Sequence, residues 1–428
     1  MRKDGKRSVS AGTIFVLILM LLILGGTVLV ITRLSSGAHV DLTRLKPGEQ
    51  SESAVPKVTD MQEIPVETVH PLPTETPIPA GFVPEDMRTK SATLTFAGTV
   101  ALAGEVRTNS WYSDAKQYDY YDIMTLLKKE LRSDLNIVFL ENILAGEGKT
   151  SDTVASNAGA AMLKAAGFNT AACGFSRVFD KGEDGIISTR TVLEEHGIET
   201  VGICAGIGQQ AYHIADVNGI RIALLQYTGT ISSDTRKKMI KQAMSGDVPP
   251  ADAETIAADI AAVKEQGCDA VIVLLSWGKT GKAPDKAQRT LAQQTADAGA
   301  DLIVGSGSRI VSGAEKITAA DSGRQVLCVW SLGTTLSGDR SGIKRMAGML
   351  LHVTITKENG QTAIGSFSYT PLYTWKYKMD GRYYYRCLAA NADAPDGMDS
   401  DQKKKMSQAS EAVRNAMKDT PVEERAYE

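Results

Sequence analysis

The sequence predicts an α/β fold built in layers, and two observations support this prediction. Between Ser91 and Trp330, helical stretches alternate with short runs rich in Val, Ile and Leu. Continuous apolar runs of this kind are typical of strands that are buried on both faces. Several helical stretches also end at a glycine, as at Gly167, Gly197 and Gly299. We therefore expect two central sheets with helices on the outside.

The expected elements follow one another along the chain in a regular order. Strands are expected at 93–100, 135–140, 170–173, 200–203, 220–227, 270–275, 301–304 and 325–330, with helices at 119–131, 155–166, 185–196, 251–265 and 284–298. After Met346 the pattern predicts antiparallel strands at 348–356, 362–369 and 375–388. Asp380-Gly381 is a strong hairpin-turn signal inside the last of these. A charged helix is expected at 401–418, on the periphery of the domain.

The N-terminus predicts export across a membrane. Residues 1–10 form a basic tail, and residues 11–34 are almost entirely apolar. A helix of this length can cross a bilayer core of about 30 Å. Because basic flanks remain in the cytoplasm, we expect a single-pass protein of the cell membrane whose C-terminal domain is extracytoplasmic. A cleaved signal peptide is the alternative interpretation, and the apolar run is long for one.

Composition divides the rest of the chain and excludes some functions. Residues 35–90 are rich in Pro and Thr and predict a disordered linker, followed by a domain over 91–390 and a charged C-terminal tail with a helix over 391–428. The formal net charge of -3 argues against nucleic-acid binding. The five cysteines lie far apart without a pairing pattern, so core thiols are expected, although a disulfide remains possible.

Six sequence blocks carry a resemblance to a known family. They are 95–100, 138–142, 174–182, 274–278, 298–309 and 330–334. In this order and spacing they resemble the bacterial capsule-synthesis CapA family, also called poly-γ-glutamate synthesis proteins. The resemblance spans about 91–390 and implies a layered α/β/β/α sandwich of the metallophosphoesterase type.

The chain departs from this family where the family binds metal. The resemblance places metal-ligand or neighbouring motif residues at positions occupied here by Thr99, Phe139, Phe175, Ser176, Arg177, Ser276, Gly307 and Arg309. Glu141, Asp180 and Trp277 keep the family's residue type. A two-metal site needs several convergent carboxylates and imidazoles, and none of the five histidines falls in a block. We therefore expect no metal and no other cofactor, and regard the pocket as degenerate.

The replacements also introduce positive charge. Arg177 and Arg309 stand at former motif positions, and Lys279 follows the fourth block. In an open cleft these cations would bind a carboxylate or phosphate. Alternatively, the two arginines pair with Glu141 and Asp180 and fill the vacated space.

Three functions remain open on this basis. The first is a non-catalytic pseudoenzyme, tethered to the membrane, that binds an anionic envelope polymer or an assembly partner in capsule, poly-γ-glutamate or cell-envelope synthesis. The second is a divergent metal-dependent hydrolase or transferase of the envelope, built on Glu141 and Asp180. The third is a structural scaffold for protein contacts. Fold alone cannot choose between them.

Overall fold

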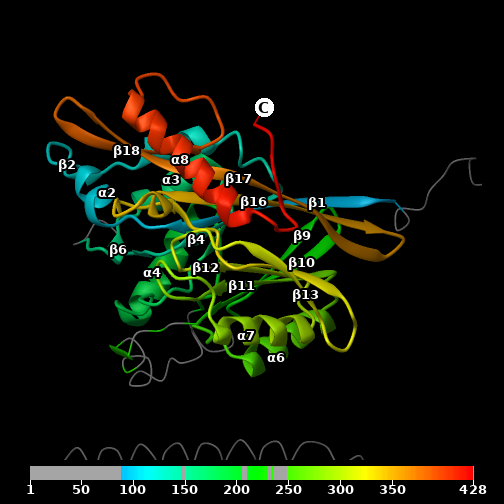
Figure 1. Ribbon diagram of the computed structural model, residues 1–428. Helices are drawn as coiled ribbons and strands as arrows, with labels where there is room; N and C mark the ends of the chain where they lie inside the picture. Colours follow the sequence, from blue (N-terminus) through cyan, green and yellow to red (C-terminus); the bar gives the residue numbers. More distant parts are fainter. Residues whose placement is uncertain are drawn as a thin grey trace, which may run out of the picture. The chain divides into compact units, whose positions relative to one another are not determined.

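The computed structural model describes residues 88–427, except 146–149, 205–209 and most of 230–247. The chain divides into two units, Met1–Pro77 and Ile78–Glu428, and the described residues belong to the second (Figure 1). The expected transmembrane anchor and nearly all of the linker lie outside the described residues. Within the described part of the chain, no helix is both long and apolar enough to cross a membrane.

The larger sheet combines a parallel and an antiparallel half. Its order is β18 (Arg382–Ala389), β17 (Gln361–Met379), β16 (Ala347–Glu358), β1 (Lys90–Val100), β4 (Leu135–Leu140), β7 (Thr170–Ala172) and β8 (Glu199–Val201). The strands β1, β4, β7 and β8 run parallel, whereas β16 is antiparallel to β1 and β16, β17 and β18 are antiparallel to one another. Two short strands, β15 (Thr334–Leu336) and β19 (Glu423–Glu424), pair with β1 and β17.

The second sheet is parallel in its centre. Its order is β13 (Ala314–Thr318), β14 (Gln325–Val329), β12 (Leu302–Ser306), β11 (Ala270–Ser276), β10 (Ile220–Thr228) and β9 (His213–Val217). The four inner strands run parallel, and the two edge strands are antiparallel to their neighbours. Both sheets therefore bring the carboxyl ends of several strands to one side, where sites commonly form in α/β proteins.

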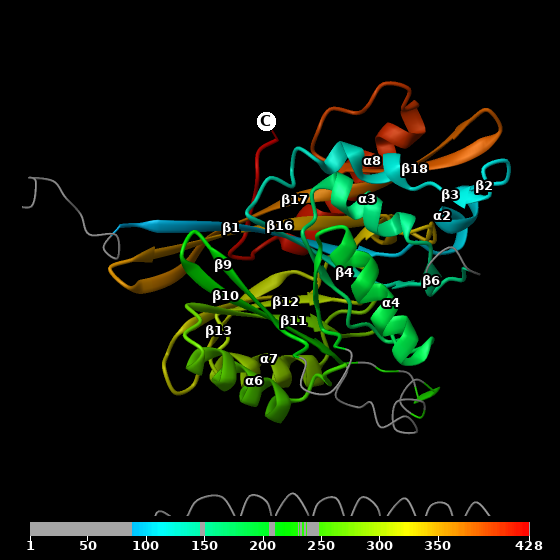
Figure 2. The ribbon, with the colours of Figure 1, turned by 180° about the vertical axis from the view of Figure 1, so that it is seen from behind.

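The ribbon views show the two sheets with helices on their outer sides (Figures 1 and 2), and the clusters of buried apolar side chains show which faces pack together. One core lies between the sheets, where Phe96 of β1 and Ile272 of β11 belong to the same cluster. A second core covers the other face of the larger sheet, and a third covers the other face of the second sheet. These outer faces are covered by α2 (Gly104–Asn109), η2 (Tyr121–Leu127), α3 (Ala158–Ala166) and α4 (Gly182–Glu195) on one side and by α6 (Ala253–Glu265) and α7 (Lys286–Asp297) on the other. The mixed α/β class is confirmed.

The C-terminal helix α8 (Ser400–Met417) has a better-defined role than the sequence indicated. Its buried side chains, which include Met406, Val413 and Met417, belong to the core between the sheets. A capping box at Asp399 and Gln402 fixes its start. The helix therefore completes the inner core beside β16 and β17, although it lies at the edge of the fold (Figure 1).

Several expected elements differ from the observed ones in detail. The helix expected at 119–131 is a shorter 3₁₀ helix, η2, which ends at Leu127 and is followed by a turn over 128–130. The strands expected at 362–369 and 375 onward are one continuous strand, β17. The hairpin turn at Asp380-Gly381 is confirmed, with both residues at positive φ. The short pairs β2 (Trp111–Tyr112) with β3 (Gln117–Tyr118), and β5 (Ile143–Leu144) with β6 (Val154–Ala155), had no sequence signal.

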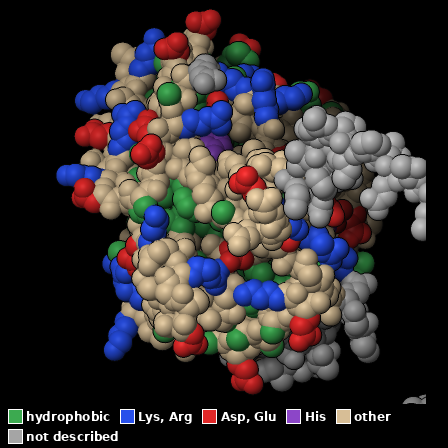
Figure 3. Space-filling model, turned by 90° about the vertical axis from the view of Figure 1, so that its right-hand side faces the viewer, with side chains coloured by type: hydrophobic (Ala, Val, Ile, Leu, Met, Phe, Trp, Pro, Cys, Tyr) green, Lys and Arg blue, Asp and Glu red, His purple; other side chains and the backbone are tan. Residues whose placement is uncertain are grey.

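Basic and acidic side chains lie close together on the surface. On the face shown in Figure 3, lysine and arginine side chains lie among aspartate and glutamate side chains, with apolar side chains exposed in a hollow near the middle. This face therefore presents no large area of a single charge.

Candidate functional site

The two sheets meet at the carboxyl ends of their parallel strands. Thr99 lies near the end of β1, and Glu141 directly follows β4. In the second sheet, Ser276 ends β11 and pairs in register with Ser306, which ends β12. Four positions from separate sequence blocks therefore lie at strand ends.

A hydrogen-bonded network joins the sheets at this point. The Thr99 hydroxyl donates to Glu141 Oε1 at 3.2 Å, and the Ser306 hydroxyl lies 3.2 Å from the Thr99 hydroxyl. Because Thr99 gives its proton to Glu141, Ser306 is the donor in the second bond. The Arg309 guanidinium forms a short ion pair with Glu141 Oε2. Both oxygens of the carboxylate are therefore occupied by side chains of this chain.

The loop after β12 turns so that Arg309 can reach Glu141. Gly307 has φ 106° and Arg309 has φ 59°, both in the left-handed region. A Cβ at Gly307 would lie 2.8 Å from the Trp277 carbonyl oxygen, so a residue with a side chain does not fit here without a shift of the backbone. The Arg309 carbonyl accepts a hydrogen bond from Thr334 at 3.1 Å. The loop therefore requires glycine at 307 and holds Arg309 in a left-handed backbone conformation.

Gln226 is a site residue that the sequence reasoning missed. Its side chain is buried on β10 and donates to the Gly174 carbonyl at 2.9 Å and to the Ser276 hydroxyl at 3.0 Å. Its own carbonyl accepts from the Gly174 N–H at 2.8 Å. The glutamine therefore links the third and fourth blocks. An amide side chain within a mostly apolar, buried strand was the available signal.

Arg177 forms a separate ion pair in the turn between β7 and α4. Its guanidinium lies 2.6 Å from Asp180 Oδ2, and this carboxylate also accepts from the Thr153 hydroxyl at 3.5 Å. The Arg177 side chain is 54% exposed, whereas Asp180 is 19% exposed. Phe175 is buried and Ser176 is exposed. The third block therefore reaches the surface through Arg177.

Trp277 and Lys279 do not join the network around Glu141. The Trp277 ring stacks on Trp330 at 5.5 Å, and its indole N–H donates to the Trp330 carbonyl at 3.0 Å. Both rings belong to the core on the helix-covered face of the second sheet. Lys279 is exposed in the loop after β11. Phe139 is buried in the core between the sheets.

The positive charge of Arg309 is balanced locally. Besides Glu141, the carboxylate of Asp339 interacts electrostatically with Arg309. The pKa of Asp339 is lowered chiefly by a hydrogen bond from the Ser341 hydroxyl, with smaller contributions from Arg345 and Arg309. Asp339 also pairs with Arg345 at 3.8 Å. The strand-end site therefore contains paired charges of both signs.

This donor set does not fit a metal centre. Thr99 and Ser306 supply neutral hydroxyls, and Gly307 supplies no side chain. Glu141 is already bound by a guanidinium, which stays protonated and repels a divalent cation. Within the described residues, no group of three His, Cys, Asp or Glu side chains could hold a metal ion.

The fold and the site define an α/β domain in which an ion pair and hydrogen-bonded hydroxyls join the two sheets at their strand ends. A family model described as bacterial capsule synthesis protein PGA_cap matches residues 93–339, more than half of the chain. The chain belongs to this family, and the resemblance stated from the sequence blocks is confirmed. The match ends before β16, so β16, β17, β18 and α8 lie beyond it.

Comparison with solved structures finds distant likenesses. A hypothetical protein from Thermus thermophilus is 14% identical with a TM-score of 0.38, covering 65% of this chain and 99% of its own. A novel phosphatase from Mycoplasma pneumoniae is 13% identical with a TM-score of 0.39, covering 66% and 94%. The calcineurin-like phosphoesterase YfkN from Bacillus subtilis is 12% identical with a TM-score of 0.39, covering 77% and 98%. No curated protein matches the chain.

Proposed function

We propose that this protein is a non-catalytic, membrane-anchored member of its family. Its extracytoplasmic domain would hold an anionic envelope polymer or an assembly partner during capsule synthesis. The family connects the chain with capsule synthesis, and the apolar segment at 11–34 supports the anchor.

The observation that carries the proposal is the closed network at Glu141. A catalytic metal site needs carboxylates that are free to bind the ion, but Glu141 is held by Thr99 and Arg309. A cation such as Arg309, placed beside the carboxylate instead of a metal ligand, would keep the strand ends in position and would remove the metal-dependent chemistry. Of the expected anion-binding residues, Lys279 is exposed, Arg177 is 54% exposed while it pairs with Asp180, and Arg309 pairs with the largely buried Glu141. A polymer would therefore contact Arg177 and Lys279 from outside.

Genetic complementation tests this proposal. In a strain lacking the protein, the double variant Glu141→Gln/Arg309→Met keeps similar side-chain volumes and removes both charges together. We expect capsule levels equal to those restored by the wild-type chain, because the pair performs no chemistry. Immunoblotting must show equal amounts of both proteins.

Loss of capsule with normal protein abundance would contradict a non-catalytic role. Metal analysis of the full-length protein provides an independent check. Stoichiometric Mn, Fe or Zn that disappears in Glu141→Ala would favour the divergent hydrolase or transferase instead.

A further inference from the structure

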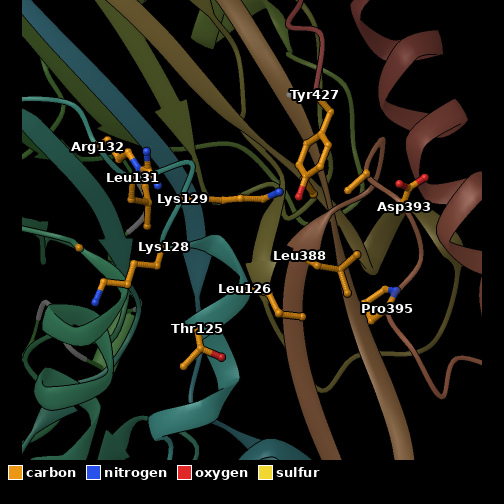
Figure 4. Close-up of a pocket in the computed structure, with 13 residues that line it drawn as sticks. Thr125, Leu126, Lys128, Lys129, Leu131, Arg132, Leu388, Asp393, Pro395 and Tyr427 are labelled. Atoms are coloured by element: carbon orange, nitrogen blue, oxygen red, sulfur yellow. The ribbon is translucent and has the colours of Figure 1, made fainter.

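A large pocket lies away from the strand-end site. One side of the pocket is formed by the end of η2 and the residues after it, up to Arg132. The other side is formed by the end of β18, the loop at 392–395 and Tyr427 (Figure 4). Its volume is about 650 Å³, which is in the range of small-molecule sites. None of its lining residues belongs to the Glu141 network. It is therefore a separate feature of the fold.

One part of the pocket is apolar. Leu126, Leu131 and Leu388 line it together with Pro395 and two alanines. Leu131 and Leu388 belong to the buried cores, so this wall is firmly supported. Such a surface gains free energy when an apolar group covers it and excludes water.

The other part is basic. Lys128, Lys129 and Arg132 line the pocket, and Asp393 is the acidic residue among the lining side chains. Within the described part of the chain, none of these three cations forms an ion pair. The Lys129 ammonium instead lies 3.7 Å from the centre of the Tyr427 ring, and Figure 4 shows it extended toward that ring. The formal net charge of these four side chains is +2.

We propose that this pocket binds a phosphate monoester that carries an apolar group. The phosphate would lie against Lys129 and Arg132, and the apolar group against Leu126, Leu131 and Leu388. A phosphate monoester carries about -1.5 to -2 charge at pH 7, which Lys129 and Arg132 together can neutralise, whereas a carboxylate supplies a single negative charge. Arg132 can donate two parallel hydrogen bonds to phosphate oxygens. The inference does not depend on the proposed function.

Binding of 1-naphthyl phosphate to the full-length protein tests the proposal. The protein is held in nanodiscs of neutral phospholipid, with empty nanodiscs as the blank, and binding is measured by calorimetry. We expect Lys129→Gln and Arg132→Gln each to weaken binding about fivefold or more, as loss of one charge-assisted contact does. Lys181→Gln, an exposed lysine outside the pocket, is the matched control and should bind like wild type.

Three related probes separate the two halves of the site. Inorganic phosphate and 1-naphthol should each bind at least tenfold more weakly than 1-naphthyl phosphate, and 1-naphthoate should fall between. Leu126→Asn should weaken 1-naphthyl phosphate and leave inorganic phosphate unchanged. The proposal is overturned if 1-naphthyl phosphate does not bind, if both charge variants bind like wild type, or if inorganic phosphate binds equally well.

Discussion

Arg309 determines the charge balance of the strand-end site. Its guanidinium forms an ion pair with the Glu141 carboxylate. The Glu141 side chain is only 16% exposed, so its charge needs a partner in the folded state. Of the two interpretations that the sequence left open for Arg309, the geometry favours internal pairing.

The variant Arg309→Ala should therefore affect stability. It removes the cation that pairs with the Glu141 carboxylate and leaves the weaker hydrogen bond from Thr99, and an unsatisfied polar group costs about 1–3 kcal/mol. We expect urea denaturation to show a free energy of unfolding lowered by that amount. Lys405→Ala, which removes an exposed helix pair with Asp401, should leave the midpoint unchanged.

The opposite pattern would indicate a ligand site. Arg309→Ala would then melt like the wild type and lose affinity for poly-glutamate or teichoic-acid fragments.

At the level of elements, the strand ends of the second sheet are fixed by close backbone approach. The Leu332 N–H donates to the Gly305 carbonyl at 3.1 Å, and Trp277 and Trp330 stack beside this glycine. A Cβ at Gly305 would lie 2.1 Å from the Trp330 carbonyl oxygen and 2.5 Å from the Trp277 indole nitrogen. The retained Trp277 therefore packs the loop after β12 against its neighbours.

Gly305→Ala should consequently destabilise the domain. Because the nearest atoms are backbone and a packed indole, they cannot move aside easily, and overpacking of this kind costs about 1–3 kcal/mol. Chemical denaturation followed by tryptophan fluorescence measures the change. Gly365→Ala is the matched control, since nothing lies within 4 Å of its added Cβ. Equal stability of the two variants would show that the loop adapts without strain.

Sequence patterns predicted the helices and strands well where the spacing of apolar residues was regular. The helix expected at 284–298 is α7, and the buried run at 270–275 is β11. Pairing within the site was only partly predictable, because it depends on which side chains meet across two sheets. Glu141 and Arg309 are 168 residues apart, and no local pattern encodes their contact. The link from Gln226 to Gly174 was missed for the same reason.

At the scale of the whole molecule, the region that the family model matches does not complete the core. Strand β16 pairs with β1 along most of its length, and β17 and β18 extend the same sheet. Side chains of β16 and α8 join those of β1 and β11 in the core between the sheets. The folded unit therefore extends well past residue 339, and the expected tail over 391–428 contains an integral helix.

The proposed export of this domain can be tested with single cysteines. Four of the five native cysteines are buried and Cys268 is partly exposed, so Cys268→Ser gives a background with little accessible thiol. Asp321 lies in an exposed turn of the domain, and Asp4 lies in the basic tail before the apolar segment. In intact, wall-stripped cells, a membrane-impermeant maleimide should label Asp321→Cys and not Asp4→Cys, because basic flanks stay in the cytoplasm. Lysed cells should label both. Labelling of Asp4→Cys alone in intact cells would reverse the topology and remove the basis for an envelope function.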